Sequence, residues 1–525
     1  MIDRTDSSLL WVDQNTIHNG SGSFEAPYVS LELALQNVQP GNTIVLAGGT
    51  YESSSTIQVS GTIESPIVIL GDDQSEVVVK AGCWYLYDAS DLIISNITFR
   101  DCLQGAISVV GRCRRNRFSG LRFFNCGTEN STSSTLFFGG SGAQCNVVEQ
   151  CYFEHAPRLK QATGQSVSGD LKNVSIGLML SEGDANRPAD VSAGDSDDFA
   201  PNVNHLIRRN AFVNYDYGLL LGSSQRIDRE YGTIVEHNLI SSCTHGIVVY
   251  SGDTALRGNT VKLCSGDSIA VLAGRGSVIA DSRIVDCGRG IRIRGLAHSV
   301  NNNCLVRCAE MGVRLECAAG LTGLAARSIV VEHNTFVDCG ASTVVLEAGT
   351  SGVIQNNLAH SAVDAVFIAD TSIEIAESST YLLAHNGVAG MVKKTTGAEC
   401  AAVEFADPAN DNFTNQSGFG ASGWMLCPQA YDPDAAVSSP RISPEEIALA
   451  AEILRARAIS PGTSGAIDAD EQDDPHETDS ILEQSFFFNH SPNGGNDSNS
   501  DDDSGMDNDG EIDNEMGTGS SVDDD

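Results

Sequence analysis

The chain has 525 residues, with 69 aspartates and glutamates against 31 lysines and arginines, so its formal net charge is -38. This charge argues against nucleic acid as a partner, because binding phosphate groups requires a basic surface. No apolar run approaches the roughly 20 residues of a membrane-spanning helix, and residues 1–11 lack the basic and apolar regions of a signal peptide. We therefore expect no membrane span, and two locations stay open: inside the cell, or outside it from a gene start further upstream.

Residues 12–50 are predicted to form an N-terminal cap. Apolar residues recur at helical spacing from Val29 to Val38, Ser30 can cap this helix, and Pro40-Gly41 ends it. The segment from Thr43 to Leu46 then opens the first strand. A short amphipathic helix is useful at this place if strands stack behind it, because the first coil of a stacked array otherwise exposes apolar surface.

Residues 51–397 read as short strands with a repeat and without a convincing helix. Each unit has a polar residue, a short apolar strand, a cysteine, a glycine and a second strand. The asparagines that mark the units are Asn96, Asn210, Asn238, Asn259, Asn303 and Asn334. From Asn238 onward the marker positions recur every 21 to 23 residues when Ser282 is counted as the marker between Asn259 and Asn303, with one step of 31 before Asn334. This period without a helix favours a parallel β-helix, with the asparagines stacked at a turn, where their amides bond along the stack and left-handed backbone angles are tolerated.

Side-chain alternation predicts which residues of these strands face the core. In the strand around residue 292, Ile291 and Ile293 should point inward and Arg292 and Arg294 outward. The equivalent strand one repeat later should present Arg314 on the same outer side. Coils stacked in register would therefore bring these guanidinium groups together along one flank.

The fifteen cysteines are an odd number, so they cannot all pair within the chain. Most of them recur at one place in the repeat, as Cys243, Cys264, Cys287 and Cys308 do. We expect a stack of buried, reduced thiols rather than disulfides, since free cysteine behaves as a small apolar residue. The sequence has no Cys-x-x-Cys pair, which argues against zinc.

The regular spacing breaks between His155 and Asn204, and this polar excursion is either one wall of a functional site or a disordered loop. Residues 398–460 are predicted to be an irregular C-terminal cap followed by a helix from Ser443 to about Arg457. Residues 461–525 contain 20 acidic residues and no lysine or arginine. This composition is typical of a disordered acidic tail.

The stretch from Val203 to Asn357 resembles the polysaccharide lyase family that includes chondroitinase B and related alginate lyases. The segments that carry the resemblance are Val235–Leu239 with Cys243, Arg257–Thr260, Gly290–Gly295 with His298, Asn302-Asn303, Glu332–Phe336 and Asn356-Asn357. The resemblance implies an all-β fold, a right-handed parallel β-helix of the pectin-lyase type, and an extracellular or periplasmic location. It also implies β-elimination on a uronate polysaccharide, with a lysine as base, an assisting arginine, and a calcium ion held by an asparagine and two glutamates.

The chain departs from this family at the catalytic positions. Residues 243–254, where the glutamates and the lysine would fall, contain neither residue type. Asn238 is the one match to a calcium ligand, and a single neutral oxygen does not hold calcium, so we expect no cofactor and no metal. Arg275 lies two positions from the place of the family's arginine, while Arg292 and His298 match its motif.

A cluster of arginines is the main candidate for substrate binding. Residues 275–314 contain seven arginines and three acidic residues in an otherwise acidic chain. Guanidinium groups bind carboxylates and sulfates through paired hydrogen bonds. The predicted substrate-binding residues are Arg292, Arg294, His298 and Arg314. The alternative is a solvated ladder of charges that Glu316 and Glu347 balance.

Candidates for the catalytic groups are Tyr250, His245 and Arg275. Tyrosine and histidine can both transfer protons, although Tyr250 equally suits a sugar-stacking platform and His245 an exposed turn. A glycosidase with paired carboxylates is not supported, because the central repeats lack an aspartate pair.

Two functions therefore stay open. The first is binding and eliminative cleavage of an acidic polysaccharide in a groove over residues 215–347. The second is a non-catalytic protein of the same fold that binds carbohydrate or has a structural role at a surface, since a fold does not imply one function. In both cases we expect a monomer.

Overall fold

The computed structural model describes residues 4, 6–72, 74–127, 133–139, 142–156, 174–181, 203–222, 232–317, 325–340, 342–347, 349–370, 380–384, 386–394, 398–400, 405–407 and 412–415, with side chains up to residue 360. The chain divides into two compact units, residues 1–463 and 464–525, and all described residues belong to the first. Within this described part, no helix is both long enough and apolar enough to cross a bilayer.

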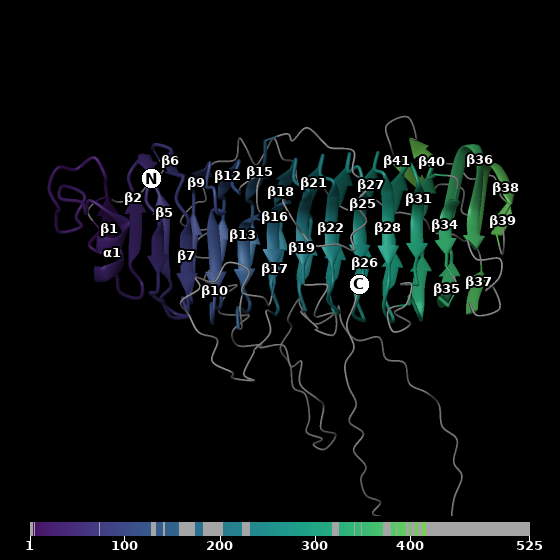
Figure 1. Ribbon diagram of the computed structural model, residues 1–525, viewed down its shortest axis with the longest axis horizontal. Coiled ribbons are helices and arrows are strands. Elements are labelled where there is room, and N and C mark those ends of the chain that lie inside the picture. The colour runs from purple at the N-terminus through teal and green to yellow at the C-terminus, as the bar shows by residue number, and fades with distance from the viewer. Residues whose placement is uncertain are drawn as a thin grey trace, which may run out of the picture. The chain divides into compact units, whose positions relative to one another are not determined.

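The described helix α1 (Leu31–Asn37) lies where helical spacing predicted it (Figure 1). Ser30 caps it as expected, accepting a hydrogen bond at its Oγ from the Leu33 backbone nitrogen at 3.4 Å. Leu31, Ala34 and Leu35 are buried and belong to the main hydrophobic core. The helix therefore covers apolar surface at the N-terminal end of the strands.

Short strands form three parallel ladders, and most coils of the chain contribute one strand to each ladder (Figure 1). The first ladder is a 14-stranded sheet. Its strands are β1 (Leu9–Val12), β2 (Thr43–Leu46), β5 (Ile67–Gly71), β8 (Leu92–Ser95), β11 (Arg117–Ser119), β14 (Val147–Glu149), β17 (Leu206–Arg208), β20 (Ile234–Glu236), β23 (Ala255–Arg257), β26 (Val278–Ala280), β29 (Ser299–Asn301), β32 (Ile329–Glu332), β35 (Ser351–Gln355) and β37 (Thr380–Ala384).

The second ladder follows the first around each coil. Its strands are β3 (Gly49–Tyr51), β6 (Val77–Lys80), β9 (Thr98–Arg100), β12 (Arg122–Phe124), β15 (Tyr152–Glu154), β18 (Ala211–Val213), β21 (Leu239–Ser241), β24 (Thr260–Lys262), β27 (Arg283–Val285), β30 (Cys304–Val306), β33 (Thr335–Val337), β36 (Leu358–Asp370), β38 (Asn386–Lys394) and β39 (Ala398–Cys400).

The third ladder completes each coil. Its strands are β4 (Ser55–Ile57), β7 (Trp84–Tyr87), β10 (Ile107–Val110), β13 (Ser133–Gly139), β16 (Ser175–Leu180), β19 (Tyr217–Leu221), β22 (His245–Val249), β25 (Asp267–Val271), β28 (Arg289–Ile293), β31 (Met311–Leu315) and β34 (Ser342–Leu346). The long strand β36 pairs with β33 of the second ladder and with β34 of the third, and so joins these two ladders into one sheet. Among the described strands, β40 (Phe405–Asp407) and β41 (Asn412–Asn415) form an antiparallel pair.

This arrangement is the predicted parallel β-helix. Inward-pointing side chains of the strands fill its core, and Ile291, Ile293, Val313 and Leu315 are all fully buried in it, as alternation predicted. The glycine of each repeat is explained by close approach of neighbouring coils. A Cβ atom on Gly290 would lie 2.0 Å from the Gly312 carbonyl oxygen.

The repeated asparagines stack at a turn and bond along the stack, as predicted. The side-chain Oδ1 of Asn238 accepts a hydrogen bond from the Asn210 backbone nitrogen at 3.0 Å, and its Nδ2 donates to the Ile207 backbone carbonyl at 2.9 Å. The expected backbone conformation was wrong in one respect, because the left-handed residue is the one before each stacked asparagine, such as His237 at φ 54°. Asn96 is itself left-handed, at φ 56°, and stands in that preceding position.

The cysteines that follow strands of the second ladder are buried free thiols. Cys243 donates from Sγ toward the Ser241 carbonyl at 3.5 Å, and Cys287 toward the Val285 carbonyl at 3.3 Å. Cys151, which follows the first-ladder strand β14, is also buried, and burial raises the pKa of its thiol to about 12, although backbone hydrogen bonds oppose the shift. These contacts fit thiols that act as packing groups of the turn.

Part of the predicted excursion between His155 and Asn204 is regular structure, because β16 pairs with β13 and β19 inside the third ladder. The other residues of the excursion, 157–173 and 182–202, lie outside the described residues. So do the predicted helix from Ser443, the acidic tail, and most of the predicted cap over residues 398–460.

Candidate functional site

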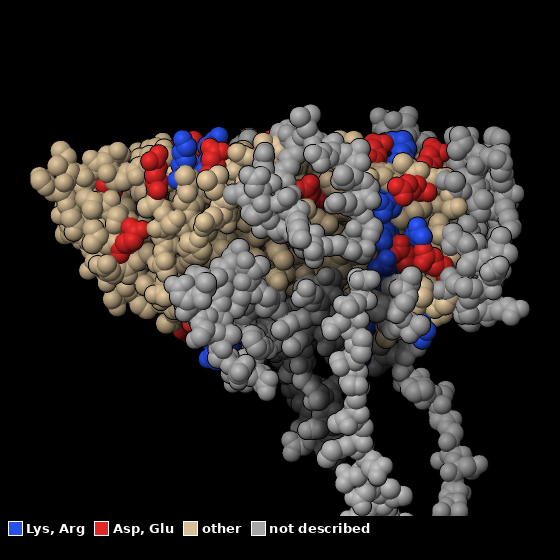
Figure 2. Space-filling view, viewed as in Figure 1, with Lys and Arg blue, Asp and Glu red and all other residues tan. Residues whose placement is uncertain are grey.

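The predicted arginines lie on the outer face of the third ladder. Ala270 of β25 pairs in register with Arg292 of β28, and Arg292 pairs with Arg314 of β31. Neighbouring strands are about 4.8 Å apart, so the two guanidinium groups come from adjacent rungs of one row. Figure 2 shows that this flank, over β28 to β34, carries intermixed basic and acidic residues rather than a basic patch.

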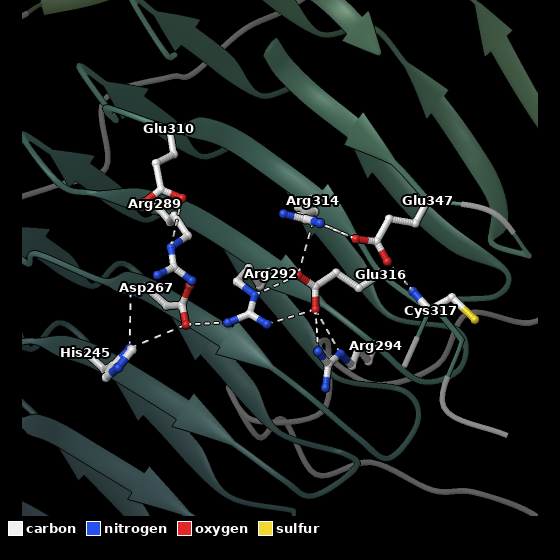
Figure 3. Close-up of polar contacts among 10 residues, drawn as sticks. All are labelled: His245, Asp267, Arg289, Arg292, Arg294, Glu310, Arg314, Glu316, Cys317 and Glu347. Atoms are coloured by element: carbon white, nitrogen blue, oxygen red, sulfur yellow. Dashed lines mark hydrogen bonds and ion pairs between the residues drawn. The ribbon is translucent and has the colours of Figure 1, made fainter. Parts of the chain in front are cut away.

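Arg292 is buried at the centre of this flank, with 8% of its surface exposed. Its Nη1 donates to Asp267 Oδ2 at 2.7 Å, while its Nε and Nη2 donate to the two carboxylate oxygens of Glu316, both at 2.9 Å (Figure 3). Such paired contacts are among the strongest ion pairs in proteins. Arg292 points outward as predicted, but two carboxylates occupy its guanidinium group, so it is not a surface residue for a ligand.

Arg294 and Arg314 are more exposed than Arg292. Their side chains are 26% and 37% exposed. Arg294 donates from Nε to Glu316 Oε2 at 2.9 Å, and Arg314 donates from Nε to Glu347 Oε1 at 2.9 Å. Arg314 Nε also lies 3.2 Å from Glu316 Oε1. These two arginines therefore reach solvent while each keeps an acidic partner.

His245 and Arg289 extend the same group of contacts toward the N-terminal side (Figure 3). Arg289 Nη1 lies 3.2 Å from Asp267 Oδ1, and its Nε lies 3.2 Å from Glu310 Oε2. His245 is buried, its ring stacks on Tyr217 with centroids 4.9 Å apart, and its Nδ1 lies 3.4 Å from Asp267 Oδ2. The expectation that His245 is an exposed turn residue was wrong.

Together these residues form what we call the ion-pair cluster. Its members are Arg289, Arg292, Arg294 and Arg314 with Asp267, Glu310, Glu316 and Glu347. The contacts thus agree with the alternative in which acidic residues balance the arginines. The charges are not all solvated, because Asp267, Arg292 and Glu316 at the centre are buried.

The pKa values of the buried members follow from these contacts. Burial by itself would raise the pKa of Asp267, yet His245, Arg292 and Arg289 hold it below its ordinary value. Burial likewise opposes ionisation of Glu316, and its arginine partners, Arg292 first, lower its pKa. Both carboxylates are therefore charged at neutral pH, as the geometry of the pairs requires.

Tyr250 follows β22 and lies beside the cluster. It packs, half-buried, against an outer apolar group that includes Tyr217, Val248, Ala270 and Leu272. Burial raises the pKa of its phenol, and the nearby guanidinium groups of Arg294 and Arg292 offset part of the rise. At neutral pH the phenol is protonated and can donate a hydrogen bond, but it cannot act as a base without a large cost.

The other two predicted residues do not join the cluster. His298 is fully buried, its Nδ1 accepts a hydrogen bond from the Ser277 backbone nitrogen at 3.0 Å, and burial lowers its pKa to about 4. Its predicted role in binding substrate needs correction, because solvent does not reach it. Arg275 is exposed in the loop after β25, where its backbone forms a bridge with Leu296.

The residues present do not fit the calcium site that the family resemblance implied. Asn238, the one matching ligand, is 1% exposed, and its side-chain oxygen and nitrogen both serve the asparagine stack. Across the residues that the structure describes, no group of three or more His, Cys, Asp or Glu side chains could hold a metal ion.

Sequence reasoning missed Asp267, which links His245, Arg289 and Arg292. The signal was present, because Asp267 lies 22 residues before Arg289 and so pairs with it in register. An acidic residue one repeat before a basic one indicates such a pair once the coil length is known.

Residues 217–388 match the family model described as a right handed β-helix region. This match confirms the predicted handedness. Among curated proteins, the pectate lyase PEL9 of Emericella nidulans is 33% identical over 72 residues. That segment is 13% of this chain and 18% of the length of the pectate lyase, so the similarity covers a small part of both proteins.

The solved structures that resemble this chain include several polysaccharide lyases. The PL6 family alginate lyase AlyGC superposes with a TM-score of 0.60 at 16% identity, over 79% of this chain and 58% of the lyase. A PL6 alginate lyase in complex with a trisaccharide gives 0.54 at 15% identity, over 80% and 94%. A mannuronic acid specific family 6 lyase from human gut microbiota gives 0.53 at 19% identity, over 71% and 88%. At such identities the likeness establishes the fold.

Proposed function

We propose that this protein binds an acidic, uronate-containing polysaccharide along the outer face of the third ladder. The observation that carries the proposal is that half-buried Tyr250 and the partly exposed Arg294 and Arg314 share one outer face, on two neighbouring rows that run over the four coils from β22 to β31. An aromatic ring offers an apolar surface to a sugar ring, and guanidinium groups donate to hydroxyl and carboxylate oxygens. The similarity to alginate and pectate lyases supports a polysaccharide as the ligand class.

The buried members of the cluster have a positioning role in this proposal. Glu316 accepts from both Arg292 and Arg294, and Asp267 fixes the other end of Arg292. The exposed guanidinium groups therefore stand on a rigid base. A preorganised surface loses less side-chain entropy when it binds a ligand.

The proposal is tested with alginate, chondroitin, dermatan and pectate, each titrated against the protein by calorimetry. Replacing Arg294 and Arg314 together by alanine should weaken binding by about 30-fold, since each surface contact contributes about 1 kcal/mol. A matched control is Arg307→Ala, because Arg307 is an exposed arginine that pairs with Asp286 at 2.6 Å after the second ladder. Equal affinity of the double variant and the control would remove this face as the binding site.

Eliminative cleavage is the second candidate function, and the protonated phenol of Tyr250 beside two guanidinium groups favours it. β-Elimination needs a neutralised carboxylate, a base and an acid for the leaving oxygen. In this scheme Tyr250 donates the proton to the leaving oxygen and Arg275 helps to neutralise the carboxylate. His245, the base candidate from the sequence, is buried against Tyr217, so the scheme assigns it no contact with substrate and leaves the base unassigned. The same four polysaccharides are followed by the absorbance of the unsaturated product. Binding without product identifies a non-catalytic carbohydrate-binding protein.

The finer assignments follow from the same proposal. We include three of them in the proposal: a resemblance to chondroitinase B among the lyases, an extracellular or periplasmic location, and a monomeric state. Sedimentation of the whole chain at several concentrations tests the monomer, because a self-associating protein sediments faster as its concentration rises.

A further inference from the structure

The formal charges of the ion-pair cluster cancel. Its four guanidinium groups face four carboxylates, and every arginine lies within 3.2 Å of at least one acidic oxygen. Arg292, at the centre, is shared between Asp267 and Glu316. A flank that the sequence shows as strongly basic is therefore electrically neutral as a unit, within a chain of net charge -38.

Arg294 and Arg314 already use part of their guanidinium groups to contact carboxylates. Among the described residues, the contacts of Arg294 and of Arg314 use the Nε and Nη2 nitrogens, with Glu316 and Glu347 as partners. A guanidinium group carries five N–H donors, so each arginine keeps donors on its Nη1 nitrogen. These donors can bind a hydroxyl group or a single carboxylate, but the adjacent acidic oxygens offset the attraction to further negative charge.

The same face is apolar toward the N-terminal side. In the row that contains Arg292, the preceding rungs are Leu220, Val248 and Ala270. In the neighbouring row, Tyr250 and Leu272 precede Arg294, and both pack into the outer apolar group. A ligand lying along these rows would contact an apolar half followed by a charge-balanced half, which suits sugar rings that mostly lack charge.

We infer that the proposed binding face takes a polysaccharide whose free carboxylates are sparse, separated by neutral or esterified sugars, in preference to a densely charged polyuronate or a sulfated glycan. The inference rests on the proposed function and names its substrate class. A dense polyanion brings many charges to a surface with no net positive charge. Such a surface does not attract the many charges of the polyanion. A sparsely charged chain instead gains hydrogen bonds and ring contacts, which do not depend on a positive surface.

Glycans with one backbone and different charge density test the inference directly. The probes are pectate against methyl-esterified pectins, and alginate against its propylene glycol ester, each titrated at low and at high salt. We expect tighter binding to the esterified forms and a shallow dependence on salt. Tighter binding to the fully charged forms, with a steep loss at high salt, would overturn the inference alone. No binding to any of these probes or to the chondroitins would instead contradict the proposed function, and the inference with it.

Variants that unbalance the cluster provide the second test. Glu347→Gln removes one negative charge beside Arg314 and should raise the affinity for pectate about threefold. Glu310→Gln removes one negative charge beside Arg289. The Glu310 side chain is 60% exposed, so this change should not disturb folding. The control is Glu332→Gln, which removes the same charge from the first ladder, where Gln355 contacts it at 2.9 Å. Equal pectate affinity in all three variants would overturn the charge-balance argument.

Discussion

Glu316 shows how one buried residue can decide the properties of a surface. It is 4% exposed and accepts hydrogen bonds from Arg292 and Arg294. Replacing it by alanine leaves Arg292 with one carboxylate and two unpaired buried donors, so we expect a loss of about 3–5 kcal/mol in unfolding free energy. Urea unfolding followed by circular dichroism measures it. Glu310→Ala, at an exposed pair with Arg289, should cost about 0.5 kcal/mol or less; equal losses would contradict a buried hub.

His298 gives the molecule a specific dependence on pH. Its pKa falls from 6.5 to about 4 in the fold because burial disfavours the charged ring. Between these values the unfolded chain binds a proton that the folded chain does not, so stability is complete above about pH 6.5 and falls as the pH drops toward 4, by about 1.4 kcal/mol per unit. The loss should reach about 3 kcal/mol. Asp267 and Glu316, whose pKa values are lowered, lose their contribution at still lower pH.

The variant His298→Gln isolates this effect. Unfolding free energies measured at several pH values should show a shallower fall between pH 6.5 and 4 than the unchanged protein shows. His18→Gln is the control, because His18 is exposed in the N-terminal cap. Parallel pH profiles for the unchanged protein and the His298 variant would show that the ring does not resist protonation in the fold.

At this scale the sequence predicted which way the side chains point and offered Glu316 and Glu347 as balancing acids, but it missed the burial of Arg292 and its partner Asp267. Alternation alone placed Ile291 and Ile293 in the core and turned Arg292 outward. It could not show that Arg292 is buried, because its partners Asp267 and Glu316 come from the coils before and after it. The burial of a charged side chain depends on such contacts between repeats, which no single strand contains.

The asparagine stack holds the turn between the first and second ladders. Asn303 is fully buried, its oxygen accepts from the Ser282 backbone nitrogen at 3.0 Å, and its amide donates to the Ile279 carbonyl at 2.9 Å. The stack was predictable from the spacing of the asparagines, since a fixed period in a coil places equal residues above one another. Which residue of the turn has left-handed angles was not, because asparagine is common in both positions.

Asn303→Ala tests how much this stack contributes. The change leaves a buried N–H and a buried carbonyl without partners, each costing about 1–3 kcal/mol, so we expect a loss of about 2–6 kcal/mol. Urea unfolding measures this loss. In addition, the backbone amides of peptides around Ser282 should exchange hydrogen faster in the variant than in the unchanged protein. Asn301→Ala, on the same coil, removes a contact with Ser299 on the outer side and is the control. Unchanged, slow exchange at Ser282 in the Asn303 variant would contradict the idea that the Asn303 side chain protects the Ser282 amide.

At the scale of the whole molecule, the fold was predictable because one short repeat specifies every coil. A period near 22 residues, alternating strands and small turn residues agree with one another, and such agreement defines a stacked array. The candidate site was less predictable because it is built from four coils at once. Among its acidic members Glu316 and Glu347 are equivalent, directly after Leu315 and Leu346, whereas Asp267 and Glu310 fall at other places in their repeats, so no single motif indicates the whole set.

Charge is also divided unevenly over the molecule, and this division should affect binding. Residues 468–525 carry 20 acidic residues without a lysine or arginine, more than half of the net charge of -38. Residues 464–525 form a unit separate from residues 1–463. A tethered group of negative charges repels an acidic glycan over a distance of about 10 Å at 0.1 M salt and about 3 Å at 1 M.

Removing residues 464–525 should therefore speed the association of residues 1–463 with pectate, on the order of tenfold at about 10 mM salt, and leave the rate unchanged at about 1 M, where salt screens the charges. Stopped-flow or surface-based kinetics measures the rate, and circular dichroism verifies that the shortened chain keeps its strands. A chain of full length in which the acidic residues after 463 become asparagine and glutamine separates charge from bulk. If that chain associates as slowly as the unchanged protein while the shortened chain is fast, the last segment acts by its volume and the electrostatic account fails.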